Sequence, residues 1–547
     1  MRLVERRIGL LFALFLLLFA AAGMRALWLA TVRADSLSER AVSQQTEDLT
    51  VPARRGTITD RNGLELAVSE DSVTLFANPF LIDDPADVAR QLAAITGIEE
   101  EELLDQLADR DQGFVYLARK LDLTTGEKLE KLEIEGIGTV VEPKRRYPQD
   151  ELASQLLGSV GTDNYGLSGL EQAFEDTLHG EDGKRRLVKD ALGEPVSIVE
   201  TERADPGEDL RLTIDGAIQE RAEVVLSEVG AAYQPNGATA LVLDPRDGAI
   251  LALANWPQVN ANEIDEAPRW ALRNKAVTSS YEPGSTFKPF TVAAALEERI
   301  IEPESRLDVP ATIQVADREI GEAHEGGGGN LSVADILAQS SNVGTVMIGI
   351  KLGVERFDAW VRRYGFGTPT RVGLPGEAGG IILDPDEYSG SSLGNMPIGQ
   401  GLAVTPMQMA AAYTAIANKG IMRQPYVVAG QTKPGRRVLR ERTAEDVSSM
   451  LEGVFEPGGT AAAATVEGYT LAGKTGTAEK PDPETGGYSD YKFFASFIGY
   501  APARDPRLLI AVMVDEPQGA YYGAEVAAPA FEKIVEFALP YLRIPPD

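Results

Sequence analysis

The sequence predicts an α+β protein with an N-terminal membrane anchor, a middle domain and a larger C-terminal domain. Two groups of apolar, β-prone segments lie at residues 238–254 and 469–514, and a long helix-rich block separates them. Strands at both ends of a region with helices between them predict helices packed against an antiparallel sheet, here with five strands. A chain of 547 residues exceeds the usual size of one domain, so more than one is expected.

Composition excludes several classes of protein. Hydrophobic residues make up 44% of the chain and charged residues 25%, which is ordinary for a globular protein. The net charge of 52 − 83 = −31 argues against a nucleic-acid partner, because a polyanion is repelled. The absence of cysteine excludes disulfides, thiolate catalysis and cysteine-based zinc sites. The two histidines, His179 and His324, leave little for a Ser-His-Asp site, and His324 is interpreted as a loop residue.

The N-terminus predicts a membrane anchor. Residues 8–24 contain no charge and follow three arginines. A helix of this length spans roughly 26 Å at 1.5 Å per residue, and further apolar residues extend the predicted anchor to residues 8–28. The positive-inside rule places residues 1–7 in the cytoplasm and the rest of the chain outside, as a single-pass protein of the cell membrane. A cleaved signal peptide is the alternative, because small alanines are available as a cleavage site. A polar stalk is expected over residues 29–50.

A pedestal domain is expected over residues 51–215. The dipeptide Asn62-Gly63 lies between two β-prone runs and predicts a hairpin with a type I′ turn, which needs two positive φ angles. Residues 84–142 are predicted to form helices with short strands. The basic run at residues 144–148 is interpreted as a strand end with internal ion pairs.

The C-terminal domain is predicted over residues 216–547. A strand over residues 209–215 precedes it, and its first helix runs to about residue 227. Two apolar strands joined by a tight turn follow, and three more strands and a closing helix form the far end. The five strands are expected at residues 238–244, 248–254, 469–472, 493–500 and 508–514, and the closing helix at 529–542.

Three short segments contain candidate catalytic residues, and the first is Ser285-Thr286-Phe287-Lys288. Pro289 is tolerated only near the start of a helix, so a helix must begin close to Ser285. Ser285 then lies at the positive end of a helix dipole, with Lys288 one turn away on the same face. A partly desolvated lysine has a lowered pKa and can take the proton of a serine. A lone Ser-x-x-Lys segment is more often solvated surface.

The second segment is Ser340-Ser341-Asn342, expected at the C-terminal turn of a short helix over residues 332–339. A serine and an aspartate at the start of that helix are placed to form a capping box. Residues such as these often only cap a helix. In a catalytic setting, Ser340 could pass a proton to a leaving amine, and Asn342 could hold Lys288 and a substrate amide.

The third segment is Lys474-Thr475-Gly476-Thr477, in a predicted strand with glycines on both sides of the lysine. Glycine in a strand marks a place where another backbone approaches, so an extended peptide could add to this edge. Lys474, Thr475 and Thr477 would then meet the terminal carboxylate of the peptide. The backbone N–H groups of Ser285 and Thr477 would form an oxyanion hole.

Together, in this order, the three segments make the chain resemble the class B penicillin-binding proteins. The resemblance covers nearly the whole chain and is specific in combination. Four further segments match the family: residues 281–284 (Tyr-Glu-Pro-Gly), 399–406 (Gly-Gln-Gly to Thr-Pro), 494–502 (Phe-Ala-Ser-Phe-Ile-Gly-Tyr-Ala-Pro), and the pedestal signature at 55–63.

The resemblance implies a membrane-anchored peptidoglycan D,D-transpeptidase with a serine β-lactamase-like catalytic domain and no metal or cofactor. It assigns catalysis to Ser285, Lys288, Ser340, Asn342 and Lys474. Ser285 attacks the penultimate D-alanine carbonyl of a donor stem peptide, D-alanine leaves, and an amine of an acceptor stem peptide forms the cross-link. β-Lactams acylate the same serine and stall there. The implied partners are a polytopic glycan polymerase and proteins of division or elongation.

Several alternatives share these segments. A β-lactamase needs neither an anchor nor a pedestal, and no Glu-x-x-Leu-Asn deacylation segment is obvious. A D,D-carboxypeptidase differs only in using water as the acceptor. A non-enzymatic penicillin-binding sensor would need a cytoplasmic output domain, and a degenerate scaffold is disfavoured because all three segments are intact. Within class B, residues 158–171 favour the septal (FtsI-type) branch over the elongation branch.

Overall fold

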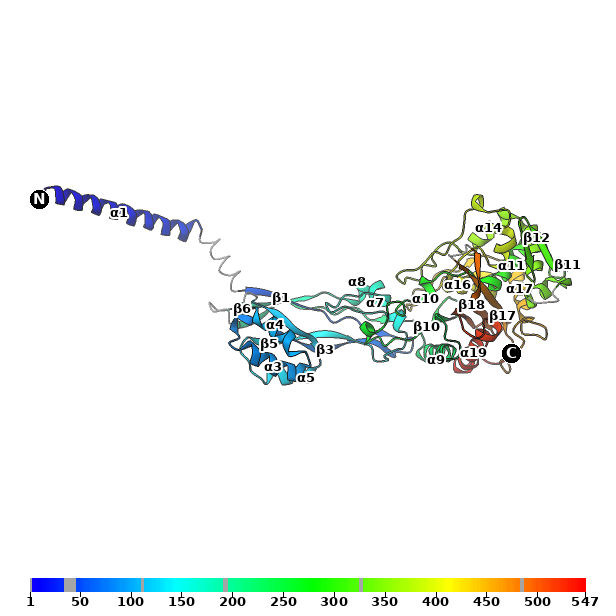
Figure 1. Ribbon diagram of the computed structural model, residues 1–547, viewed down its shortest axis with the longest axis horizontal. Helices are drawn as coiled ribbons and strands as arrows, with labels where there is room; N and C mark the ends of the chain where they lie inside the picture. Colours follow the sequence, from blue (N-terminus) through cyan, green and yellow to red (C-terminus); the bar gives the residue numbers. More distant parts are fainter. Residues whose placement is uncertain (1, 34–45, 110–112, 190–194, 324–327, 483–486) are drawn as a thin grey trace.

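The computed structural model is elongated, with the N-terminal helix at one end and the C-terminal domain at the other (Figure 1). Helix α1 (Arg2–Thr31) contains one segment, Arg6–Thr31, that is long and apolar enough to cross a membrane. The structure describes residues 2–33, 46–109, 113–189, 195–323, 328–482 and 487–547. His324 and most of the expected stalk lie outside the described residues.

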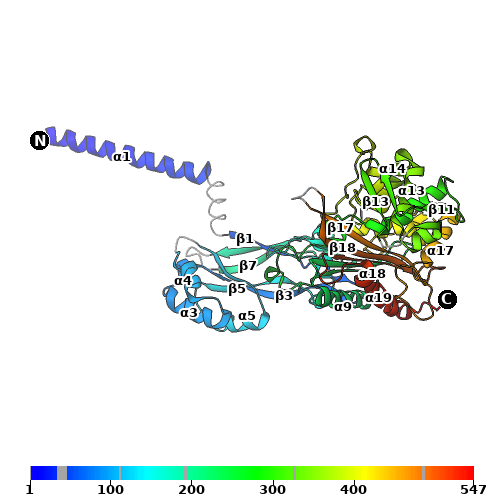
Figure 2. The same ribbon diagram turned by 45° about the vertical axis from the view of Figure 1, so that its right-hand side comes forward.

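The pedestal contains two sheets and a set of short helices. One sheet has the order β1-β6-β7, and in the other β3 pairs with β2, β4 and β5, while β2 also pairs with β8. Figure 2 labels β1 and β7 of the first sheet and β3 and β5 of the second. The described residues within 84–142 form helices and strands, as expected, and helices α3 and α4 pack together. The strands are β1 (Thr46–Val51), β2 (Ile58–Thr59), β3 (Glu65–Ala77), β4 (Val115–Leu121), β5 (Ile137–Arg146), β6 (Gly183–Lys189), β7 (Pro195–Glu202) and β8 (Leu210–Arg211). The helices are α3 (Pro85–Thr96), α4 (Glu100–Ala108), α5 (Leu123–Glu130), α6 (Ser154–Leu157), α7 (Gly169–Ala173) and α8 (Glu175–Leu178).

Three local expectations in and beside the pedestal are corrected. The hairpin at Asn62-Gly63 forms between β2 and β3, but only Gly63 has a positive φ, of 93°, so the turn is not type I′. The Asp60 carboxylate accepts hydrogen bonds from the N–H groups of Asn62 and Leu64, which supports a three-residue loop with glycine in the left-handed position. The strand expected at residues 209–215 is only the two residues of β8. Strand β1 begins within the segment expected as a stalk.

The basic run at the end of β5 forms internal ion pairs, as expected. Arg145 Nε donates to Glu171 at 2.6 Å, and both side chains are buried. The other carboxylate oxygen of Glu171 accepts from Arg55, whose guanidinium also reaches Glu175 at 2.8 Å. The positive charges of two arginines therefore neutralise the negative charges of two glutamates inside the pedestal. This pairing is needed because an unpaired buried charge would destabilise the fold.

The C-terminal domain is built on an antiparallel five-stranded sheet with the order β10-β9-β19-β18-β17. The five expected strands are all present, although β17 begins at Ala472 and extends far beyond the expected end. The last helix confirms the expected closing helix. The strands are β9 (Gly237–Leu243), β10 (Ile250–Trp256), β17 (Ala472–Asp482), β18 (Gly487–Ala501) and β19 (Leu508–Asp515).

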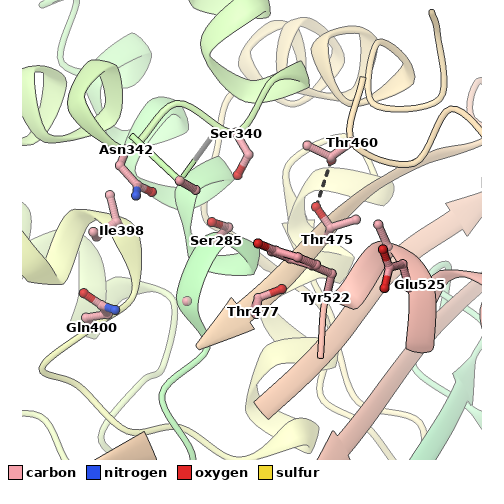
Figure 3. A pocket seen from close by; sticks show the side chains of 13 residues that line it. Ser285, Ser340, Asn342, Ile398, Gln400, Thr460, Thr475, Thr477, Tyr522 and Glu525 are labelled. Atoms are coloured by element: carbon pink, nitrogen blue, oxygen red, sulfur yellow. Dashed lines mark hydrogen bonds between the residues drawn. The ribbon is translucent and has the colours of Figure 1, made fainter. Parts of the chain in front are cut away.

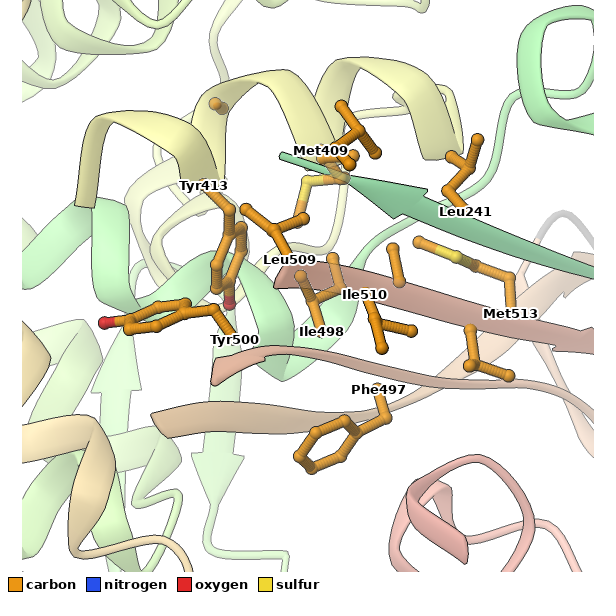
Figure 4. Close-up of a cluster of buried hydrophobic side chains, with 14 of the residues drawn as sticks. Leu241, Met409, Tyr413, Phe497, Ile498, Tyr500, Leu509, Ile510 and Met513 are labelled. Carbon is orange, nitrogen blue, oxygen red and sulfur yellow. The ribbon is translucent and has the colours of Figure 1, made fainter. Parts of the chain in front are cut away.

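Helices cover both faces of this sheet (Figure 4). Met409 and Tyr413 of α16 pack on one face. Phe497 on β18 points to the other face, where its ring lies 4.7 Å from that of Phe531 on α19. The principal helices are α9 (Gly216–Tyr233), α11 (Lys288–Glu297), α12 (Val333–Ala338), α13 (Asn342–Leu352), α14 (Val354–Arg363), α16 (Pro406–Ala417), α17 (Glu441–Glu452), α18 (Gly523–Val526) and α19 (Ala528–Tyr541). The shorter helices are α10 (Lys275–Thr278) and α15 (Ser392–Asn395), and the small strands are β11 (Arg306–Val309), β12 (Thr312–Val315), β13 (Arg318–Gly321), β14 (Gly329–Ser332), β15 (Ile421–Met422) and β16 (Arg436–Arg437).

The pedestal and the C-terminal domain share one hydrophobic cluster. Its buried members include Ile58, Leu156 and Leu170 of the pedestal together with the apolar residues of β9, β19 and α19. At the joint, the second carboxylate oxygen of Asp60 accepts from the N–H of Gly216, the first residue of α9. The turn of the pedestal signature therefore fixes the start of the C-terminal domain.

Candidate active site

Ser285 lies on a 3-10 turn, η3 (Gly284–Phe287), directly before α11. This agrees with the expectation that a helix begins close to the serine. The side chain of Phe287 is buried and anchors the turn in the core, whereas Ser285 is partly exposed. Gly284 has a φ of 54°, which favours glycine, and its backbone touches that of Gly399 so closely that a side chain at residue 399 would not fit.

Lys288 is fully buried at the first residue of α11. Its Nζ donates to the carbonyl oxygen of Ser340 at 2.6 Å, to Oδ1 of Asn342 at 2.7 Å and to Oγ of Ser340 at 3.2 Å. Burial lowers the pKa of Lys288 to about 7, and the negative charge of Glu322 opposes this shift. A buried amine with a pKa near neutrality can accept a proton.

The second segment lies between two helices and not only at the end of one. The helix expected over residues 332–339 is α12, and its capping box is present. Ser340 then adopts a left-handed φ of 61°, Ser341 is the N-cap of α13, and Asn342 is the first residue of α13. The sequence did not indicate this second helix start, which is what fixes the direction of Asn342.

Glu322 holds the second segment from the end of β13. Its carboxylate accepts hydrogen bonds from the Ser341 hydroxyl and, at 2.7 Å, from the N–H of Asn342. The side-chain amide of Asn342 also donates to the carbonyl of Gly321. The arrangement leaves Oδ1 of Asn342 directed at Lys288.

The third segment lies in β17, paired on one side with β18. Lys474 is fully buried, and its Nζ lies 3.2 Å from the carbonyl oxygen and 3.3 Å from Oγ1 of Thr475. Burial and, secondarily, the charge of Lys288 lower the pKa of Lys474 well below its ordinary value. Two buried amines whose charges oppose each other do not readily carry two protons together.

A pocket of about 340 Å³ brings most of the candidate residues together (Figure 3). Ser285, Ser340, Asn342, Thr475 and Thr477 line it, whereas Lys288, Lys474 and Gly476 are buried and are not among its lining residues. The remaining lining residues are Gly284, Ala323, Ile398, Gln400, Thr460, Tyr522, Ala524 and Glu525.

Sequence reasoning missed several of these lining residues. Thr460 and Thr475 share a hydrogen bond of 2.8 Å between their hydroxyls, and the N–H of Gly523 donates to Oγ1 of Thr477. The ring of Tyr522 extends into the space beside Ser285 (Figure 3). An adjacent tyrosine pair followed by glycine was the available signal, but nothing local places it at the site. Among the described residues, no group of His, Cys, Asp or Glu could hold a metal ion.

Family models match both halves of the chain. The model described as "Penicillin binding protein transpeptidase domain" matches residues 238–536, and the model described as "Penicillin-binding Protein dimerisation domain" matches residues 50–212. The chain belongs to the class B penicillin-binding proteins. The predicted family, the α+β fold class and the predicted enzyme class, a transpeptidase, are thereby confirmed.

Relatives of this penicillin-binding protein span almost its whole length. It is 34% identical to the probable peptidoglycan D,D-transpeptidase PenA of Neisseria meningitidis, over 99% of this chain and 93% of that protein. It is 32% identical to the peptidoglycan D,D-transpeptidase FtsI of Escherichia coli, over 100% of this chain and 93% of that protein. The crystal structure of penicillin-binding protein 3 from Mycobacterium tuberculosis in complex with aztreonam has 30% identity and a TM-score of 0.71, covering 91% of this chain and 98% of that one.

Two coarser expectations for this penicillin-binding protein also hold. Among the described residues, one helix is long and apolar enough to cross a membrane, and its place at the N-terminus is consistent with a single-pass membrane anchor. A domain of this family binds β-lactams and peptidoglycan substrates.

Proposed function

We propose that this penicillin-binding protein cross-links peptidoglycan stem peptides through an acyl-enzyme on Ser285. The observation that carries the proposal is the placement of Lys288. Its buried Nζ is held by Ser340 and Asn342, which line the same pocket as Ser285, and its pKa is lowered to about 7. A base with this pKa is suited to removing the proton of a serine hydroxyl at neutral pH.

In the first half-reaction, Lys288 takes the proton of Ser285 as the serine oxygen bonds to the penultimate D-alanine carbonyl. The backbone N–H groups of Ser285 and Thr477 stabilise the oxyanion. The proton taken by Lys288 passes through the Ser340 hydroxyl, 3.2 Å from Nζ, to the amine of the terminal D-alanine as its bond to the carbonyl breaks, which leaves Lys288 neutral for the second half-reaction. Lys474, Thr475 and Thr477 hold the terminal carboxylate, and the absence of a side chain at Gly476 lets the strand approach η3.

In the second half-reaction, an amine of an acceptor stem peptide attacks the ester on Ser285. The amine loses a proton to the same base, the new amide forms, and the serine hydroxyl is restored. A β-lactam opens on Ser285 by the first half-reaction and keeps its leaving group attached, so deacylation is slow. The dimerisation domain supports a transpeptidase over a carboxypeptidase, because a hydrolase of small peptides would not need such a domain.

We place this activity on the outer face of the cell membrane, with residues 1–7 in the cytoplasm, α1 as the anchor, a pedestal over residues 51–215 and the catalytic domain over 216–547. The three arginines before the apolar helix support this orientation. We assign the protein to the septal branch and expect a polytopic glycan polymerase and division proteins as partners. The match to FtsI over the whole chain supports the septal assignment.

The first test is labelling with a fluorescent penicillin. We expect the wild type to be labelled, Ser285→Ala to be unlabelled, and Ser449→Ala, an exposed serine on α17, to be labelled as the wild type is. An unlabelled wild type, or equal labelling of Ser285→Ala, would overturn the assignment. Incubation with two stem peptides then shows whether the acceptor is the amine of a second peptide or water. A cross-linked dimer supports transpeptidation, and release of D-alanine without a dimer identifies a carboxypeptidase.

A further inference from the structure

Glu525 is the acidic residue on the wall of the active-site pocket. The other lining side chains are small, apolar, or neutral and polar: the hydroxyls of serine, threonine and tyrosine and the amides of Asn342 and Gln400. Figure 3 shows Glu525 on α18, beside Thr475 and on the far side of Tyr522 from Ser285. A formal negative charge therefore stands at one end of an otherwise neutral wall.

The carboxylate of Glu525 is not used elsewhere within the described part of the chain. Glu525 is exposed, no lysine, arginine or histidine there forms an ion pair with it, and only its backbone carbonyl accepts a hydrogen bond, from Tyr233. Its charge contributes, as the smallest of four causes, to the raised pKa of the neighbouring Tyr522. The pKa of Tyr522 is raised by the hydrogen bond with Tyr521, then by burial, and then by the charges of Tyr521 and Glu525.

The basic groups of the site do little to balance this charge. Lys288 and Lys474 are both fully buried, and burial lowers the pKa of each. Glu322 faces Ser341 and Asn342 and already accepts two hydrogen bonds. Glu282 is partly buried, and its pKa is raised. Glu525 is thus the exposed carboxylate that a bound ligand meets.

We propose that Glu525 makes the pocket selective for ligands that carry a primary ammonium group and unfavourable for ligands that carry an additional carboxylate. The proposal rests on the proposed function, because the ligand must occupy the pocket with its reacting carbonyl at Ser285. For the natural reaction, the chemistry indicates a stem peptide with a free amine, either on the donor or on the acceptor. At an exposed site the interaction is screened by water and weakens further with salt.

The test uses two matched series of β-lactams. In the first, penicillins differ only at the α-carbon of a phenylacetyl side chain, which carries hydrogen, an ammonium or a carboxylate. In the second, cephalosporins with one acyl side chain carry a neutral, a cationic or an anionic group at C3. The measured quantity is the second-order rate constant of acylation, from time-resolved mass spectrometry of the acyl-enzyme. The rate constant of each charged compound is divided by that of the neutral compound in the same series.

We expect the wild type to favour the cationic over the anionic member by about fivefold in at least one series, as expected for one unit charge several ångströms away in a solvated pocket. Glu525→Gln should reduce this ratio to near one, and Glu525→Lys should reverse it. Added salt should reduce the ratio of the wild type. The series with the larger effect shows whether Glu525 faces the acyl side or the leaving-group side of the ligand.

A matched control is Glu536→Gln, which removes the same charge from an exposed position on α19 outside the pocket lining. It should leave the ratio of the wild type unchanged. The inference about Glu525 is wrong if, in both series, the cationic-to-anionic ratio of rate constants is the same in the wild type and in Glu525→Gln. It is also wrong if Glu536→Gln reduces this ratio as much as Glu525→Gln does. If no compound acylates the wild type, or if Ser285→Ala is acylated equally, the proposed function itself fails.

Discussion

Nζ of Lys288 lies 2.7 Å from Oδ1 of Asn342, although the two residues are 54 positions apart in the chain. With the carbonyl of Ser340, this contact holds a fully buried amine next to the pocket that contains Ser285. Burial removes the hydration of the amine and lowers its pKa, while the hydrogen bonds hold the side chain in place.

The rate constant of acylation by a neutral penicillin should rise with pH through about 7. Lys288 accepts the serine proton only when it is itself unprotonated, and burial lowers its pKa to about 7. Below about pH 6 the rate constant should fall about tenfold per pH unit, and above about pH 8 it should be level. Stopped-flow acylation across this range gives the profile. A constant rate from acid to alkaline pH would show that Lys288 is not the base.

Replacing Glu322 by glutamine should move the midpoint of that profile to lower pH. The charge of Glu322 opposes the lowering of the Lys288 pKa, so its removal lets the pKa fall further. Glutamine also loses one of the two acceptors used by Ser341 and Asn342, so the plateau rate should drop as well. Glu319→Gln, an exposed position on β13, should change neither value. A lower plateau with an unmoved midpoint would mean that Glu322 acts only as a structural support.

Substitution of Gly476 by alanine should abolish labelling by penicillin. A Cβ atom at residue 476 would lie 2.3 Å from Oγ of Ser496 and 2.9 Å from Cγ2 of Thr286, next to the nucleophile. Strand β17 would have to move away from η3, and the pocket would lose its geometry. Gly113→Ala, where a Cβ would have nothing within 4 Å, is the control and should label normally. Normal labelling of Gly476→Ala would show that the strand is not held this tightly.

Arg55→Met should destabilise the protein by about 3 kcal/mol or more, since it leaves the buried charge of Glu171 without one of its two partners. The measurement is the urea midpoint of unfolding, followed by circular dichroism. Arg54→Met removes an ion pair with Asp71 in which both side chains are largely exposed, and it should have a much smaller effect. Equal midpoints for the two variants would mean that the buried network contributes little net stability.

Local sequence patterns were enough for the apolar strands of the C-terminal sheet and for the helix start beside Ser285. The apolar runs that became β9, β10 and β19 are buried throughout or nearly so, and such runs leave few alternatives. The placement of Ser285 followed from the proline after Lys288, because proline restricts where a helix can start. These inferences depend on neighbouring residues only.

Other features depend on contacts that no local pattern encodes. Glu322, Thr460 and Tyr522 join the site from three separate parts of the chain, and their roles follow from the packing of β13, β17 and α18. The turn at Asn62-Gly63 was assigned the wrong type because the Asp60 carboxylate, two residues earlier, controls its N–H groups. In that case local hydrogen bonds from the backbone to the Asp60 side chain outweighed a reliable dipeptide signal.

The hydrophobic cluster shared by the pedestal and the C-terminal domain has a consequence for truncated forms of this protein. A truncated chain that starts after β8 would leave the apolar partners of Ile58, Leu156 and Leu170 facing water, and the first N–H of α9 would lose Asp60. Such a fragment should aggregate although it contains every catalytic segment. A soluble enzyme is therefore expected to need the pedestal segments that carry Ile58, Leu156 and Leu170, and removal of the N-terminal apolar helix alone keeps them.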